Sequence, residues 1–133
     1  MTTQTTTLKS LCSKVKCEAQ YGKISQAWDN LDEWQQRAHN YRVTLRYKGR
    51  QYSLDYFTGE ALTDEPDAET VLDSLLSDSQ SGEQSFDEFC GEFGYDTDSR
   101  KAEATWKACQ KASENVKRLL GDDYETFLYA ERN

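Results

Sequence analysis

The stretch YRVTLRYKGRQYSLDYF, residues 41–57, decides the fold because apolar and polar side chains alternate along both of its halves. Its apolar side chains fall on one face: Tyr41, Val43, Leu45, Tyr47, Tyr52, Leu54 and Tyr56. Such alternation is typical of a β-strand with one buried and one solvated face. Residues 48–50 (KGR) separate the halves and are typical of a tight turn. The sequence therefore predicts a β-hairpin over residues 41–57.

The segments before the hairpin are predicted to extend its sheet. A lone hairpin is marginally stable in water, so other elements must cover its apolar face. CEAQYG (17–22) is predicted to add a third strand, and apolar residues at helical spacing predict a short helix over residues 7–15. Residues 26–40 are mostly polar and are predicted to form a loop that includes at most one helical turn; this loop contains His39, the only histidine.

The pattern becomes helical after Gly59. Pro66 is expected in the first turn of a helix, where its missing N–H costs nothing. The apolar stripe of this helix consists of Ala68, Val71, Leu72, Leu75 and Leu76. The polar segment SDSQSGEQS, residues 77–85, is predicted to be a flexible link to the next element.

Three further helices are predicted toward the C-terminus. Ser85 and Glu88 predict a capping box at the start of the first, and Gly94 is expected to end it. Its inward face is predicted to consist of Phe86, Phe89, Cys90 and Phe93. The second runs from about residue 99 to 120, and the last holds Tyr124, Phe127 and Leu128 inward. The sequence predicts one α+β domain over residues 1–133, with residues 1–6 disordered: a small antiparallel sheet, a short N-terminal helix and a C-terminal bundle of about four helices.

The charge is distributed very unevenly along the chain. The formal net charge is -8, yet 14 carboxylates and no Lys or Arg lie between Asp55 and Asp98. A region with charge of one sign attracts a basic partner and accelerates association with it. We expect an acidic helical surface that binds such a partner, with these candidate residues: Asp64, Asp67, Asp73, Glu83, Asp87, Glu88 and Glu92.

Catalytic and metal chemistry is not expected. The cysteines, Cys12, Cys17, Cys90 and Cys109, lack the close pairs of a zinc site and are interpreted as reduced thiols. DTDS (96–99) lacks the ligand pattern of a calcium loop and is interpreted as a helix cap. We therefore expect no enzyme, no cofactor and no metal ion, and a metal-dependent enzyme is the least favoured alternative.

The hairpin offers an alternative function as a nucleic-acid-binding module. Arg42, Arg46, Lys48 and Arg50 accompany its tyrosines, and basic residues among aromatics bind single strands. However, the tyrosines fall on the predicted buried face, and the acidic half of the chain repels a phosphate backbone. Direct nucleic-acid binding is therefore not expected.

The chain resembles a group of small, mostly uncharacterised proteins encoded by tailed bacteriophages and prophages. The resemblance is carried by VLDSLLSD, FDEFCGEFGYDTDSRKAEATWKACQ and LLGDD, with FGYDTDSRKAE (93–103) as its most specific block. It implies a phage accessory protein. Because the chain is also small, acidic and without a catalytic motif, it is similar in type to anti-CRISPR proteins, and we expect it to block a basic host protein or ribonucleoprotein complex of nucleic-acid defence. The number of carboxylates is compatible with a nucleic acid mimic, which the sequence leaves open. With no signal peptide or membrane span predicted, the expected location is the host cytoplasm. The sequence gives no basis for predicting the oligomeric state.

Overall fold

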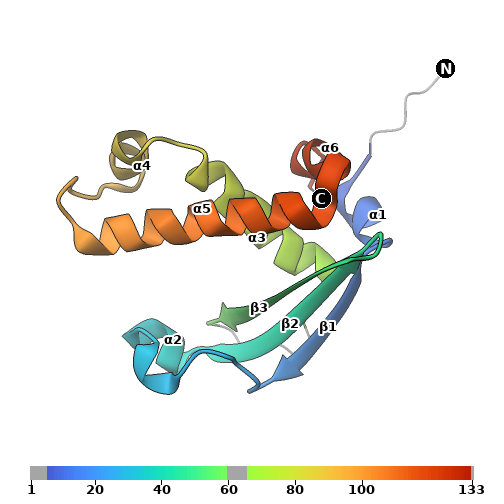
Figure 1. The fold of residues 1–133 in the computed structure, drawn as a ribbon, viewed down its shortest axis with the longest axis horizontal. Coiled ribbons are helices and arrows are strands. Elements are labelled where there is room, and N and C mark those ends of the chain that lie inside the picture. Colours follow the sequence, from blue (N-terminus) through green and yellow to red (C-terminus); the bar gives the residue numbers. More distant parts are fainter. Residues whose placement is uncertain (1–5, 60–65, 133) are drawn as a thin grey trace.

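The computed structural model describes residues 6–59 and 66–132, in which helices lie on one side of a three-stranded antiparallel sheet (Figure 1). This arrangement confirms the predicted α+β class. The elements are α1 (Leu8–Cys12), β1 (Lys16–Tyr21), the 3₁₀-helix η1 (Trp28–Asn30), α2 (Glu33–Arg37), β2 (His39–Tyr47), β3 (Arg50–Thr58), α3 (Ala68–Gly82), α4 (Phe86–Phe93), α5 (Arg100–Leu120), the 3₁₀-helix η2 (Gly121–Asp123) and α6 (Tyr124–Leu128). The candidate Asp64 lies outside the described residues.

The sheet has the order β1–β2–β3, with β2 in the centre. Tyr47 pairs with Arg50, so the β2–β3 turn has two residues, Lys48 at φ 46° and Gly49 at φ 79°. Positive φ at both turn positions is the signature of a type I′ turn, whose twist matches that of the strands. The predicted hairpin and third strand are confirmed. The predicted loop over residues 26–40 is wrong at its C-terminal end, because β2 already begins at His39.

The core lies between the sheet and the helices. Val43 and Leu45 of β2 are fully buried against apolar side chains of the helical layer. That layer contributes Leu8, Val71, Leu72, Leu76, Val116, Leu119, Leu120 and Phe127. The alternation of β2 and the helical stripes of α3 and α5 therefore meet in one cluster, which is what the hydrophobic pattern predicts.

The polar segment 77–85 is mostly helical, so the predicted flexible link is wrong. α3 continues to Gly82 because Ser79 and Gly82 pack against α5 instead of facing solvent. The Ser79 hydroxyl is fully buried and donates to Ser113 Oγ at 3.0 Å. A Cβ on Gly82 would lie 2.6 Å from the carbonyl carbon and oxygen of Cys109. Small residues therefore allow the two helices to cross closely.

The predicted N-cap and C-terminal residues of α4 are confirmed, but the Glu88 carboxylate accepts a hydrogen bond from the Ser85 hydroxyl, which is not the reciprocal contact of the predicted capping box. The Ser85 hydroxyl accepts the Glu88 N–H at 3.2 Å, and Gly94 ends α4 at φ 72°. Pro66 does not lie in the first turn of α3, because Asp67 is the N-cap and proline precedes it. Phe93 was expected inside, but its side chain is 49% exposed, because its ring lies against Phe89 at the edge of the packed face of α4.

Candidate functional site

Five exposed carboxylates gather at one end of the molecule, on α4 and in the turn that leads to α5. We call this surface the acidic end; its residues are Asp87, Glu88, Glu92, Asp96 and Asp98. No ion pair joins any of them to a basic residue in the described part of the chain. Arg100 and Lys101 follow at the start of α5 and only partly offset this charge. The acidic end is therefore a strongly negative surface that the fold does not neutralise.

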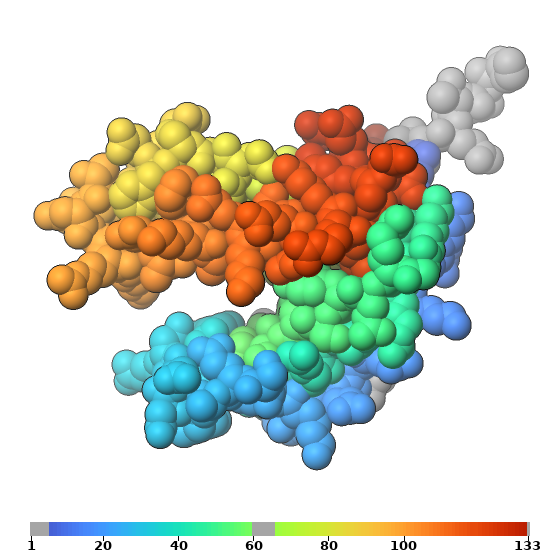
Figure 2. Space-filling model, viewed as in Figure 1, coloured from blue at the N-terminus to red at the C-terminus, as the bar shows by residue number. Residues whose placement is uncertain are grey.

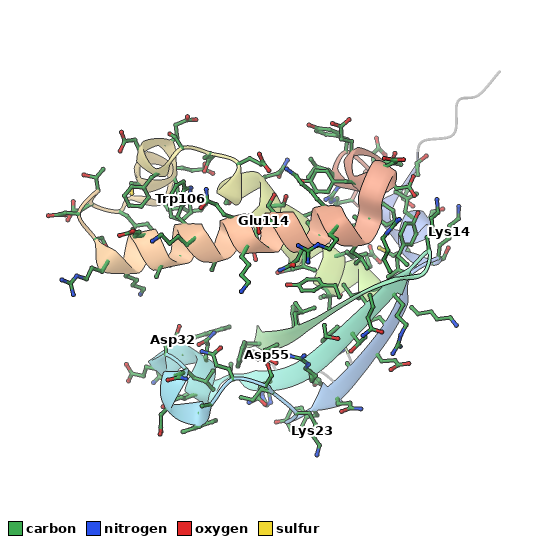
Figure 3. The ribbon with its side chains drawn as sticks, viewed as in Figure 1. Lys14, Lys23, Asp32, Asp55, Trp106 and Glu114 are labelled. Carbon is green, nitrogen blue, oxygen red and sulfur yellow. The ribbon has the colours of Figure 1, made fainter. Side chains whose placement is uncertain are left out.

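Aromatic packing holds the acidic end against α5. The Phe86 and Trp106 rings lie 5.3 Å apart, and the Trp106 indole N–H donates to the Gln84 carbonyl at 3.0 Å. Figure 3 shows Trp106 directly beneath α4. Phe89 is buried between Phe93 and Tyr95, with ring centroids at 4.9 and 6.0 Å. The carboxylates are therefore presented on a helix with a fixed orientation.

The structure separates the predicted candidates into two groups. Asp87, Glu88 and Glu92 lie together on α4. The other described candidates each have a partner within the fold. The Asp67 carboxylate accepts the Thr70 N–H and caps α3. The Asp73 carboxylate forms an ion pair with Arg132 at 3.0 Å. Their positions do not extend the acidic end.

Glu83 is the candidate that the fold neutralises most directly. The Lys117 ammonium donates a hydrogen bond to its carboxylate, and Ser113 donates another at 2.9 Å. These contacts hold the pKa of Glu83 below its ordinary value. Glu83 therefore ties the end of α3 to α5, which favours a structural role.

Asp96 and Asp98 belong to the acidic end but were not among the predicted candidates. The sequence interpretation gave the DTDS segment to helix capping, and the structure assigns that role to Ser99, whose hydroxyl accepts the Ala102 N–H at 3.1 Å. Both aspartates are left exposed. Their membership of the uninterrupted acidic run was the signal that could have identified them.

A small hollow adjoins the acidic end between α3 and α4. Its volume is about 250 Å³, and its lining includes Gln84, Glu92 and the partly exposed Phe93. The Gln84 amide donates to the Glu92 carboxylate, whereas its buried Oε1 accepts no hydrogen bond from any described residue. A buried oxygen without a partner is uncommon, and here it lies beside an exposed aromatic ring. The surface therefore offers an apolar contact, the exposed part of Phe93, next to its carboxylates.

Basic side chains gather at the opposite end, around the hairpin turn. We call this surface the basic end; it consists of Lys14, Lys16, Arg46, Lys48 and Arg50, which line a hollow of about 460 Å³. In Figure 3, Lys14 lies at the hairpin end of the molecule and Trp106 at the other end of α5. The chain is therefore negative at one end and positive at the other.

A cleft of about 500 Å³ lies between β3, α5 and the segment before α2, and Figure 2 shows the opening. Asp55 in this cleft accepts hydrogen bonds from Ser25, from the Gln26 N–H and from Arg42 at 3.1 Å. Burial alone would raise the pKa of Asp55, but these donors hold it below its ordinary value. Since its oxygens are occupied, Asp55 anchors the segment before α2 to the sheet and is not free to act as a base.

Comparison with protein-family models, with curated proteins and with solved structures gave no match. The functional interpretation therefore depends on the two charged ends and on the groups available for chemistry. Within residues 6–59 and 66–132, no helix is long and apolar enough to cross a membrane. The same residues contain no cluster of three His, Cys, Asp or Glu side chains that could hold a metal ion.

The reactive groups of the described residues are placed for structure. Burial raises the pKa of Cys12 to about 12 and that of Cys109 to about 11. Thiols with such pKa values are protonated at neutral pH and are poor nucleophiles. The Nδ1 of His39 lies 3.1 Å from the Tyr21 hydroxyl, its hydrogen-bond partner. The arrangement can bind a charged partner more readily than it can assemble a catalytic site.

Proposed function

We propose that the protein is a non-catalytic, phage-encoded inhibitor that binds a basic, nucleic-acid-handling defence protein of the host, in the manner of anti-CRISPR proteins. The observation that supports this function is the acidic end, whose five exposed carboxylates have no basic partner in the described chain. Elsewhere, Asp55, Asp73, Glu83 and Asp123 have Arg or Lys partners. Other exposed carboxylates, including Glu114, Asp122 and Glu125, also lack an ion pair in the described chain, so the acidic end is distinguished by having five such carboxylates close together on α4 and in the turn after it.

The mechanism is occupation of a phosphate-binding groove on the partner. Grooves that receive nucleic acid carry Lys and Arg side chains, which accept carboxylates as well as phosphates. Fixed carboxylates on α4 act as a nucleic-acid mimic, and their field raises the association rate. Phe93 supplies an aromatic contact of a kind that is enriched at protein interfaces. Stoichiometric blocking in the host cytoplasm follows from binding alone.

A charge-neutralised variant tests this function. Asp87→Asn, Glu88→Gln and Glu92→Gln together keep side-chain size while removing three negative charges from the acidic end. The matched control, Glu114→Gln, Asp122→Asn and Glu125→Gln, removes the same charge from exposed positions elsewhere. The readouts are phage plating on a host with an active nucleic-acid-targeting defence, and association with the partner captured from that host at 50 and 300 mM salt.

The acidic-end variant is expected to lose protection and to associate about 10-fold or more slowly at low salt. The control should protect like the wild type. Equal protection by both variants, or wild-type binding that is unaffected by salt, would contradict a function based on the acidic end. Circular dichroism of all three proteins verifies that each remains folded.

A further inference from the structure

The basic end concentrates positive charge in an acidic protein. Five cationic side chains line its hollow, and no Asp or Glu contributes to the lining. Three of them have contacts: Arg46 pairs with Glu18 at 2.9 Å, Lys48 with Asp123 at 2.8 Å, and the Arg50 Nε–H donates to the Leu119 carbonyl. Each of these side chains carries more donors than its contact uses. The hollow therefore holds unused donors and an excess of positive charge.

Two of the cations have no partner at all among the described residues. Lys14 and Lys16 are exposed, and neither ammonium makes an ion pair or a hydrogen bond in this part of the chain. The register places Lys16 directly opposite Arg46 on the neighbouring strand. Like charges in directly opposed positions of a sheet destabilise it. Lys16 is exposed, and the ion pair between Arg46 and Glu18 offsets part of this repulsion.

The turn that carries Lys48 is a second unfavourable feature at the same place. Lys48 is the non-glycine residue with positive φ among those described, at φ 46°. The first position of a type I′ turn favours Asn, Asp or Gly, because a larger L-residue is strained there. Strain at an exposed position is a reason to look for a function. Here the strained residue is a cation that extends the line of positive charge at the hairpin.

We infer that the basic end binds the phosphate backbone of a nucleic-acid strand. Five cations exceed the charge of a single phosphodiester and match several phosphates along a strand. Tyr47, the aromatic residue of the hollow, is only 6% exposed and cannot stack on bases. Binding is therefore through phosphates and indifferent to base sequence. This inference goes beyond the proposed function, because it uses the end of the molecule that faces away from α4.

The test measures fluorescence anisotropy of a labelled 20-nucleotide thymidine strand between 20 and 200 mM KCl. The wild type is expected to bind with Kd of about 10⁻⁴–10⁻⁶ M, and each single-strand phosphate contact adds about −0.7 to the slope of log K against log salt. Lys14→Gln with Lys16→Gln should weaken binding and reduce the magnitude of that slope by about 1.4. The same variant should melt at a higher temperature than the wild type, since it relieves the repulsion with Arg46.

The matched control is Arg100→Gln with Lys101→Gln, which removes two exposed cations at the other end of α5. It should keep wild-type binding and slope; an equal loss in this control would show a net-charge effect and overturn the site. Polyglutamate and inorganic triphosphate serve as competitors. Competition by polyglutamate equal to that of unlabelled strand would overturn the assignment to nucleic acid, as would full competition by triphosphate at the same phosphate concentration.

The variant Asp87→Asn, Glu88→Gln and Glu92→Gln separates this inference from the proposed function. It should bind the thymidine strand at least as tightly as the wild type, because it loses negative charge far from the basic end. Loss of strand binding in this variant would show that the two ends are not independent and would overturn the inference. Absence of any anisotropy change with the wild type at 20 mM KCl would also overturn it.

Discussion

Replacing Gly82 with alanine should destabilise the protein through the crossing of α3 and α5. The added Cβ would lie 2.6 Å from the Cys109 carbonyl and 2.7 Å from the Gln110 nitrogen, distances that side-chain Cβ atoms do not adopt. Both contacts are with helix backbone, which cannot rotate away as a side chain can. Overpacking costs up to about 3 kcal/mol, and the better helix propensity of alanine offsets at most about 1 kcal/mol. The expected net loss is about 2 kcal/mol.

Urea unfolding followed by circular dichroism measures this loss. With an m-value of about 2 kcal/mol/M, the midpoint should fall by about 1 M at unchanged m. Gly91→Ala is the matched control: Gly91 lies within α4, and a Cβ added there would meet no neighbouring atom within 4 Å. That variant should gain about 0.5–1 kcal/mol. A Gly82→Ala variant as stable as the wild type would refute the close crossing of the two helices.

Two further predictions concern buried polar groups. Ser79→Ala removes a fully buried hydroxyl that contacts the hydroxyls of Ser113 and Tyr124, so we expect a loss of about 1–2 kcal/mol in the same urea assay, whereas no change would contradict this hydrogen-bond network. Burial raises the pKa of Cys109 from 9.0 to about 11, so the folded thiol stays protonated where the unfolded one ionises. Stability should therefore fall as pH rises from 9 toward 11, and the fall should be smaller in Cys109→Ala; identical pH profiles would contradict this assignment.

Local patterns in the sequence were sufficient to predict most elements. The alternation from Tyr41 to Tyr47 identified the central strand because period two is a property of one strand alone. Ser85 and Gly94 marked the two ends of α4 because capping depends on residues within one turn. These features need no knowledge of the rest of the fold, and the structure confirms them.

Features that depend on contacts between distant segments could not be predicted in the same way. Ser79 and Gly82 suggest a loop by composition, and only their packing on Ser113 and Cys109 makes that segment helical. No basic residue interrupts the acidic run in the sequence, but the fold brings basic residues from distant segments to it. Arg132, the partner of Asp73, lies 59 residues away along the chain. Ion pairs of this kind removed Asp73 and Glu83 from the predicted acidic surface.

The single helix α5 connects the two charged ends of the molecule. The Trp106 indole binds the backbone before α4 near one end of this helix, and the Arg50 side chain binds the Leu119 carbonyl near the other. A straight helix of 21 residues is about 30 Å long and does not shorten under ordinary thermal motion. α5 therefore fixes the separation of the two charged ends, and a complex that engaged both of them, as the two proposals together require, would have to present its basic groove and its nucleic-acid strand at that spacing.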